Sequence, residues 1–356
     1  MTGPATLHCD STGRYWDRET DAELVCLAVR DETHDIRTFT FAGRDGQYFD
    51  FRPGQYFTFD VPVDGAIEPR CYSISSSSLR PRSLAVTVKR VVGGQVSNWL
   101  HDHLKPGDVL RAMGPLGQFT PPSGLPDKLL LLSGGSGITS TMAIARAFAD
   151  AACCPDTVFL YAARTPADFA FADELRLLAG SMRGFRLILL PETVGDADDF
   201  VGPAGRISPA LMDFAVPDLA ERLVMCCGPA PFMAVARAIC RDRGVPVDRY
   251  VEESFDTADQ APSECTAAAT GFNVSFSRQG KTIAVGAGQS ILSAARAQGV
   301  VLASSCANGL CGTCKSRLVS GKVDMQHNGG IRQREIDAGM ILPCCATPLS
   351  DVVIER

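Results

Sequence analysis

The chain has 356 residues, of which 46% are hydrophobic and 21% charged, and its net charge is −6. This length predicts two or three domains, and the composition is typical of a globular protein. No apolar run reaches the ~18 residues of a membrane-spanning helix, and the acidic balance argues against a nucleic-acid partner.

The first part of the chain predicts a polar tail followed by a β domain. Residues 1–20 have no basic start and no apolar core, so we expect a loose tail, no secretory signal and a cytoplasmic location. Short β-rich runs separated by Gly and Pro turns predict an all-β barrel or sandwich over residues 21–122. These runs span residues 24–29, 36–41, 56–61, 84–88 and 109–113.

The pattern changes after residue 122, where strands begin to alternate with helices. This alternation predicts a parallel α/β sheet over residues 123–255. Residues 256–270 are small and polar and predict a linker. Residues 271–356 open with two strands and a helix. The expected strands after residue 122 span 129–133, 157–161, 186–191, 223–226, 272–277 and 281–285, and the helices 139–150, 171–179, 208–214, 231–243 and 290–298.

The C-terminal segment holds the most specific motif of the sequence. Cys306, Cys311 and Cys314 have the spacing C-x4-C-x2-C, and Cys344 follows later, which is the ligand spacing of a plant-type [2Fe–2S] cluster. Free core thiols and a zinc site are the alternatives, although structural zinc usually takes paired C-x2-C units and only one is present. Cys345 adjoins Cys344, and only one of the two can be the fourth ligand.

Two glycine-containing strand ends in the middle domain predict a nucleotide site. Ser133–Thr139 follows an apolar strand and precedes a helix, so its glycines let the backbone approach a pyrophosphate. Ser140 replaces the third glycine of the G-x-G-x-x-G pattern, and a tight turn without ligand is the alternative. Cys226–Pro229 ends another strand, where open α/β sheets bind ligands.

Two motifs in the β domain indicate a flavin nucleotide. Arg70-Cys71-Tyr72-Ser73 offers a guanidinium for a phosphate and an aromatic ring for a flat ring system. A surface arginine and a core tyrosine are the alternative interpretation. Residues 93–97 precede a predicted helix and could form a second phosphate cradle.

The order of these motifs resembles the ferredoxin–NADP⁺ reductase superfamily with a plant-type ferredoxin at the C-terminus. The resemblance covers residues 20–356 and implies an antiparallel β-barrel FAD domain, an α/β parallel-sheet NAD(P) domain and a β-grasp [2Fe–2S] ferredoxin domain. It implies that Arg70 contacts the flavin phosphates, Tyr72 packs on the isoalloxazine and Ser73 lies near N5. Gly94 and Ser97 would meet the pyrophosphate of FAD, which favours FAD over FMN.

The same resemblance assigns the pyridine-nucleotide site. Cys227 would lie beside the nicotinamide, and Glu253 and Phe255 near the flavin, so catalytic roles are implied for these three residues and Ser73. Arg164 could meet a 2′-phosphate, but related NADH enzymes also carry arginine there, so NADH is favoured and NADPH stays possible. The remaining implied cofactor-binding residues are Gly134, Gly135, Gly137, Ile138, Thr139, Gly228, Pro229 and Met233.

Two features near the C-terminus narrow the resemblance. Cys344–Pro348 resembles the ferredoxin pattern C-x-A-x-P, which implies Cys344 as the fourth ligand beside Cys306, Cys311 and Cys314. Met325–Arg332 resembles reductase components that serve Rieske oxygenases demethylating quaternary ammonium compounds such as glycine betaine.

The implied activity is electron transfer from NADH through FAD and the cluster to a protein acceptor, with a Rieske-type oxygenase as the expected partner. Reduction of hybrid-cluster protein is an alternative, and a ferredoxin carrier without NADH activity is an alternative of another class. The chain has only five histidines and no C-x-H motif, so it is not expected to be the oxygenase itself. Residues 270–356 carry 9 Lys/Arg and 5 Asp/Glu, a net charge of +4, whereas residues 1–269 carry 25 Lys/Arg and 35 Asp/Glu, a net charge of −10. These opposite charges predict attraction between the two parts of the chain.

Overall fold

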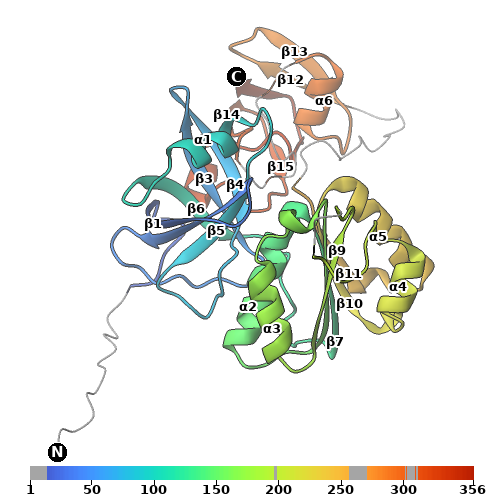
Figure 1. Ribbon diagram of the computed structural model, residues 1–356. Coiled ribbons are helices and arrows are strands. Elements are labelled where there is room, and N and C mark those ends of the chain that lie inside the picture. Colours follow the sequence, from blue (N-terminus) through green and yellow to red (C-terminus); the bar gives the residue numbers. More distant parts are fainter. Residues whose placement is uncertain (1–13, 196–198, 256–270, 301, 303–308, 310–311) are drawn as a thin grey trace, which may run out of the picture.

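A computed structural model of the chain describes residues 14–195, 199–255, 271–300, 302, 309 and 312–356. The predicted linker at 256–270 and the first 13 residues of the predicted tail lie outside the described residues. Three main sheets follow one another along the chain, each with a hydrophobic core of its own (Figure 1). Among the helices of the described part, none has the length and apolar character needed to cross a bilayer.

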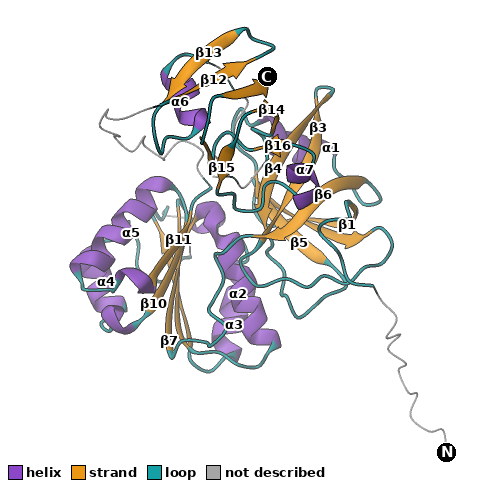
Figure 2. Cartoon of the chain, turned by 180° about the vertical axis from the view of Figure 1, so that it is seen from behind, coloured by secondary structure: helices purple, strands orange, loops and turns teal. Residues whose placement is uncertain are grey.

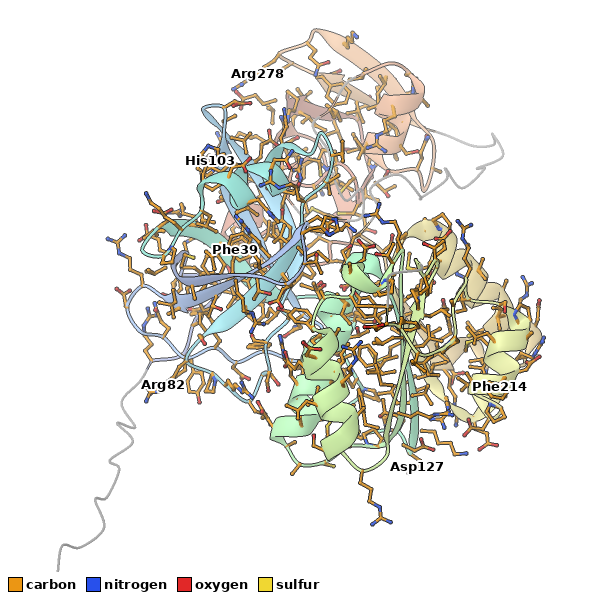
Figure 3. All side chains as sticks on the ribbon, viewed as in Figure 1. Phe39, Arg82, His103, Asp127, Phe214 and Arg278 are labelled. Atoms are coloured by element: carbon orange, nitrogen blue, oxygen red, sulfur yellow. The ribbon has the colours of Figure 1, made fainter. Side chains whose placement is uncertain are left out.

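The first domain is a six-stranded antiparallel sheet with the strand order β4-β3-β6-β1-β2-β5. A bridge between Ile74 and Val86 joins the chain after β4 to β5, so the sheet closes on itself and the predicted barrel is confirmed. Phe39 is one of the aromatic residues that fill its interior (Figure 3). The elements are β1 (Glu23–Asp31), β2 (Ile36–Gly43), β3 (Tyr56–Val63), β4 (Ala66–Ser73), β5 (Leu84–Lys89), α1 (Gln95–His103) and β6 (Val109–Leu116).

The second domain is a five-stranded parallel sheet with the order β11-β10-β7-β8-β9. Helices cover both of its faces, with α2 and α3 on one side and α4 and α5 on the other (Figure 2). Leu129–Leu132 of β7 are therefore completely buried, as expected of a central parallel strand. The elements are β7 (Lys128–Gly134), α2 (Ile138–Asp150), β8 (Asp156–Ala163), α3 (Ala172–Ser181), β9 (Phe185–Pro191), α4 (Pro209–Ala215), β10 (Leu223–Cys227), α5 (Ala230–Asp242) and β11 (Tyr250–Glu253).

The third domain is a mixed five-stranded sheet with the order β13-β12-β18-β14-β16, against which α6 packs. It lies beside the end of the barrel that carries β3 and β4 (Figures 1 and 2). The elements are β12 (Phe272–Phe276), β13 (Lys281–Val285), α6 (Ile291–Ala297), β14 (Ser316–Ser320), β15 (Val323–Met325), α7 (Gln333–Asp337), β16 (Met340–Ile341), β17 (Ala346–Pro348) and β18 (Val352–Glu355).

Candidate functional site

The carboxyl group of Glu253 lies where the first and second domains meet. Ser73, the last residue of β4, donates a hydrogen bond from Oγ to Glu253 Oε2 at 3.3 Å. The hydroxyl of Ser140, in the first turn of α2, donates to the carbonyl oxygen of Gly137 at 3.5 Å and also lies near enough to the Glu253 carboxyl to lower its pKa. Cys227 is in register with Glu253 on one side and with Ser133 on the other. The structure therefore brings together Ser73, Glu253 and Cys227, three of the four residues with implied catalytic roles.

The environment of Glu253 favours its neutral form. Burial raises the pKa of its carboxyl to about 8, and the hydrogen bonds from Ser73 and Ser140 only partly offset this effect. This shift favours the neutral form of Glu253, which can serve as a proton donor at the junction of the two domains. Phe255, two residues further on, is 41% exposed at the edge of this region.

The glycine loop after β7 packs directly against the loop after β10. A Cβ atom on Gly137 would lie 2.1 Å from the carbonyl oxygen of Cys227, and one on Gly228 would lie 3.0 Å from Gly134 Cα. Both positions therefore require glycine. Gly135, in contrast, has φ +52 and no atom within 4 Å of a Cβ, so its backbone is open to a ligand. Gly137 is the N-cap of α2, whose dipole favours a phosphate at this end.

The remaining residues assigned to this loop region differ in accessibility. Ile138 is completely buried, and Met233 is 3% exposed within the core on the α5 face of the sheet. Thr139 is buried as well, and its hydroxyl donates to the carbonyl oxygen of Ser136 at 3.1 Å. Pro229 is the N-cap of α5. These four residues shape the loops, while the open backbone of Gly135 faces outwards.

The candidate flavin residues lie on β4 and at the start of α1. Arg70 is half-buried, with Nη1 donating to the carbonyl oxygen of Pro69 at 2.8 Å. The ring of Tyr72 stands 6.1 Å from that of Phe59, centroid to centroid. Gly94 caps α1, and a Cβ on it would lie 2.8 Å from Ser97 Oγ, so the turn is closed tightly around the helix N-terminus. This arrangement fits a nucleotide phosphate at α1 and a flat ring near Tyr72.

The candidate cluster site is described for two of its four cysteines. Cys314 and Cys344 are buried and hydrogen-bonded to each other, and the backbone N–H of Gly309 donates to Cys344 Sγ at 3.2 Å. Cys345 lies in the same turn, but its thiol donates to the carbonyl oxygen of Leu342 at 3.6 Å. Cys306 and Cys311 lie outside the described residues. An amide N–H directed at a cysteine sulfur is the contact expected around an iron–sulfur cluster.

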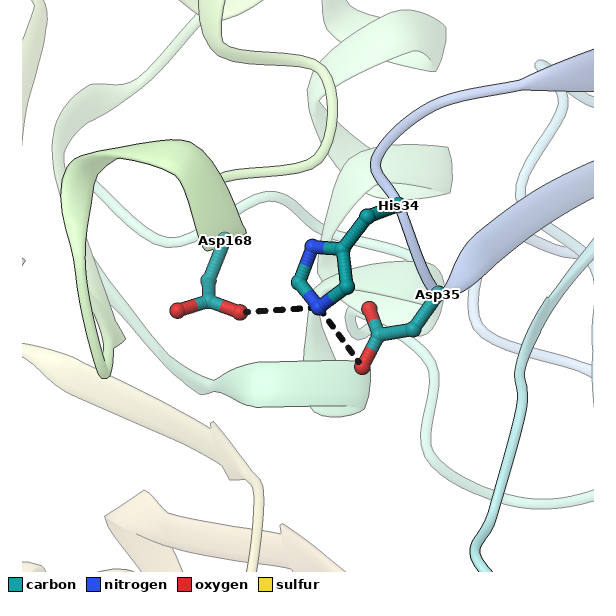
Figure 4. Close-up of side chains that lie close together, drawn as sticks. All are labelled: His34, Asp35 and Asp168. Carbon is teal, nitrogen blue, oxygen red and sulfur yellow. Dashed lines mark ion pairs between the residues drawn. The ribbon is translucent and has the colours of Figure 1, made fainter.

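Arg164 occupies a cluster of charges between the first two domains. Its guanidinium lies 3.8 Å from Asp35 and 3.6 Å from Asp168, and the imidazole of His34 lies within 4.0 Å of both carboxylates (Figure 4). Lys89 is 3.3 Å from Asp35. His34, Asp35 and Asp168 form the one described group with the geometry for a metal ion, but Lys89 and Arg164 already neutralise its carboxylates.

Comparison with known proteins identifies the three domains and the family. The family model of the oxidoreductase FAD-binding domain matches residues 25–120. The family model of the oxidoreductase NAD-binding domain matches residues 131–238, and the model of the 2Fe-2S iron-sulfur cluster binding domain matches residues 274–349. The chain is 37% identical to the glycine betaine monooxygenase reductase subunit of Pseudomonas aeruginosa, over 99% of its own length and 98% of that protein. The chain belongs to this family of oxygenase reductase subunits.

Two further proteins are similar to this reductase over nearly its whole length. The stachydrine N-demethylase reductase subunit Stc4 of Rhizobium meliloti is 35% identical over 96% of the chain and 98% of that protein. The match to the structure of phthalate dioxygenase reductase covers 95% of this chain and 98% of that chain, with a TM-score of 0.58 and 25% sequence identity. That structure was described as modular, for electron transfer from pyridine nucleotides to [2Fe-2S].

The family assignment decides between two classes left open by the sequence. The reductase is an oxidoreductase with FAD, pyridine nucleotide and a [2Fe–2S] cluster as its cofactors, and the alternative of a ferredoxin carrier without NADH activity is wrong. Sequence reasoning missed one residue of the junction. Ser140 stood out only as a departure from a glycine pattern, whereas its hydroxyl contacts Glu253.

Proposed function

We propose that this reductase takes electrons from NADH and delivers them to a Rieske-type oxygenase that demethylates a quaternary ammonium compound such as glycine betaine. The observation that carries the proposal is the similarity to the glycine betaine monooxygenase reductase subunit over almost all of both chains. Bound FAD would convert a two-electron hydride donation into single electrons, which a [2Fe–2S] cluster carries one at a time. A cytoplasmic location stays a prediction.

The test of this proposal is reconstitution with an oxygenase of the glycine betaine type. The purified reductase, NADH and the oxygenase should release formaldehyde only when glycine betaine is added, because oxidative removal of an N-methyl group yields formaldehyde. Stachydrine is the comparison substrate, and hybrid-cluster protein is the comparison electron acceptor. Reduction of hybrid-cluster protein with no turnover of either ammonium compound would contradict the proposal.

The chain's own residues have distinct tasks in this proposal. The helix N-termini at Gly94 and Gly137 bind phosphates, and the packed loops at Gly137 and Gly228 place the nucleotide over the end of β10. Glu253 holds a proton beside the hydroxyl of Ser73, at the place where the nicotinamide and the flavin would meet. Cys227, at the end of β10, orients the nicotinamide in this arrangement.

Replacing Cys227 by alanine is expected to slow flavin reduction by NADH by about tenfold, the loss typical of a displaced reactant, while FAD stays bound. Cys226→Ala is the matched control, because Cys226 is buried among core residues on the opposite face of β10. That variant should lose about 1–2 kcal/mol of unfolding free energy and keep its rate. Stopped-flow absorbance of the flavin measures the rate, and a wild-type rate in Cys227→Ala would contradict the assignment.

The charges around Arg164 favour NADH over NADPH. Burial opposes ionisation of the Asp35 carboxyl, but the nearby Lys89 holds the pKa of this carboxyl below its ordinary value. Asp35 is therefore negative beside Arg164. A 2′-phosphate would compete with this carboxylate and with Asp168 for one guanidinium. We therefore expect kcat/KM for NADH to exceed that for NADPH by at least about tenfold, the cost of one unfavourable charge contact.

The variant Asp35→Asn tests this reason directly. Removing the charge should raise kcat/KM for NADPH about threefold, as expected for a partly exposed ion pair, and leave the value for NADH unchanged. Asp31→Asn is the control, because Asp31 is an exposed partner of Arg37 on β1. Equal changes with both nucleotides would show that Asp35 does not influence the 2′ position.

A further inference from the structure

A short loop of the third domain packs against the barrel of the first domain. We call residues 326–330 the docking loop; they connect β15 to the region before α7. The hydroxyl of Tyr56, on β3, donates a hydrogen bond to the carbonyl oxygen of Asn328 at 3.2 Å. Tyr56 is only 4% exposed, so this bond is sheltered from water. The bond joins residues 272 positions apart and links the two domains directly.

The same loop contacts Gly309, which lies between Cys306 and Cys311 in the sequence. The backbone N–H groups of Asn328 and Gly330 both donate to the carbonyl oxygen of Gly309, at 3.2 and 2.9 Å. The N–H of Gly309 in turn donates to Cys344 Sγ at 3.2 Å. A continuous series of hydrogen bonds therefore runs from Cys344 through Gly309 and Asn328 to the hydroxyl of Tyr56.

The other end of this series lies beside the candidate flavin residues. Tyr56 is in register with Ser73 of β4, and the next pair along the two strands is Phe57 and Tyr72. In an antiparallel ladder, residues directly opposite each other have their side chains on one face of the sheet. Tyr56 thus stands between the docking loop and the strand end at which Ser73 meets Glu253.

The tip of the docking loop packs closely against the barrel at a glycine. Gly329 has φ +97, and a Cβ on it would lie 2.5 Å from Leu116 Cδ2, on β6. Leu116 is itself in register with Tyr56, so the two contacts share one small patch of the barrel. A side chain at residue 329 would require Leu116 or the docking loop to shift, and it would also strain the left-handed backbone.

The described charged groups at this interface interact without forming a close ion pair. Among the described residues, no ion pair within 4.0 Å joins the third domain to the other two. Arg332 reaches the backbone carbonyl oxygen of Asp21 at 3.4 Å, and burial at Asp60 outweighs the attraction of Lys315 and raises the pKa of that carboxyl. Shape and hydrogen bonding therefore position the docking loop. The attraction expected from the opposite net charges of the two parts stays a prediction.

We propose that the docking loop and Tyr56 are positioning elements that hold the cluster within electron-transfer range of the flavin. The inference rests on the proposed cofactors and on the electron path from NADH to the cluster. In each transfer, one electron leaves the reduced flavin and converts one ferric ion of the cluster to ferrous iron. Because a small displacement of reacting groups slows their reaction steeply, loosening this contact slows the transfer and leaves the earlier hydride step untouched.

The experiment compares three single variants of the full-length holoprotein. Tyr56→Phe removes only the hydroxyl, and Gly329→Ala adds a methyl group that collides with Leu116. Gly280→Ala is the matched control, because Gly280 also has a left-handed backbone, φ +62, but no atom within 4 Å of a Cβ. Stopped-flow absorbance after mixing with NADH follows flavin reduction and cluster reduction separately. Amide hydrogen exchange of residues 326–331 reports on the contact independently of activity.

The hydroxyl deletion should increase exchange of residues 326–331 and slow cluster reduction, each by about fivefold, the effect of losing one net hydrogen bond. Gly329→Ala should slow cluster reduction further, and Gly280→Ala should behave as wild type in both measurements. Flavin reduction should be the same in all four proteins. Wild-type exchange and wild-type cluster reduction in Tyr56→Phe and Gly329→Ala would overturn the inference. Neither measurement involves an oxygenase, so failure of the proposed partner would leave this result unaffected.

Discussion

Replacing Cys344 by serine is expected to remove the iron from the protein and leave its flavin in place. Cys344 Sγ is buried, faces Cys314 and accepts the N–H of Gly309, which is the environment of a thiolate ligand. Loss of one of four ligands should lower the iron content from about two atoms per chain to a small fraction. A chelator assay for iron and the absorbance of released FAD measure both quantities on one sample.

The neighbouring cysteine provides the control. The Cys345 thiol donates a hydrogen bond to the carbonyl oxygen of Leu342, whereas Cys344 Sγ accepts the N–H of Gly309. We therefore expect Cys344, and not Cys345, to be the ligand. Cys345→Ser should keep both iron and flavin, because a serine hydroxyl can donate to the same carbonyl group. The opposite pattern, with iron lost only in Cys345→Ser, would reverse the ligand assignment.

The second large effect concerns Glu253. Its carboxyl group, with a pKa of about 8, should make flavin reduction by NADH fall about tenfold per pH unit above that pKa. The reason is that ionisation removes the proton and places a negative charge where the reduced flavin would also gain charge. Glu253→Ala should lower the rate at neutral pH by about 100-fold, a typical contribution of a general acid. Stopped-flow flavin reduction over a range of pH provides the measurement.

Two amide variants separate charge from position. Glu253→Gln keeps a donor at this place and cannot ionise, so the alkaline fall in rate should disappear. Glu252→Gln alters the adjacent residue, which is paired with Arg237 on the solvent side, and should retain the wild-type pH profile. An unchanged alkaline fall in Glu253→Gln would assign the titration to another group.

The same shift in pKa affects folding. The folded protein binds the Glu253 proton more tightly than the unfolded chain does, because the folded-state pKa is the higher one. This contribution to stability is complete below the ordinary pKa of a glutamate and is lost as the pH rises through about 8. Wild type should therefore lose more stability than Glu253→Gln over that interval.

Local sequence patterns predicted most elements of the first two domains but only β12, β13 and α6 of the third. They also missed two strands that carry functional residues. Ala66–Ser73 contains Pro69 and two charged residues and shows no regular alternation, which hides β4. Its position at the end of the strand order explains why the ladder tolerates a proline there. Tyr250–Glu253 is too short to give a pattern, although it places Glu253 beside Cys227.

Contacts between distant parts of the chain explain the rest of the difference. The spacing of the cysteines and the order of the glycine motifs are local properties, so they indicated the cofactors. The partner of the Tyr56 hydroxyl lies in another domain, and the partner of Ser140 lies on a strand far along the chain. Tertiary packing alone creates such pairs, and no spacing rule within one segment can anticipate them.

The position of the docking loop has a consequence for engineering this reductase toward other acceptors. Ser73, Ser140 and Glu253 all precede residue 256, so a chimera that exchanges everything after that point keeps the proposed site of hydride uptake. A foreign ferredoxin domain would bring its own loop to Tyr56 and Leu116. We expect the flavin to reduce the cluster of that domain slowly, although the flavin site itself is unchanged. Redirecting the electrons therefore calls for new acceptor-facing residues on a domain that retains residues 326–330 unchanged.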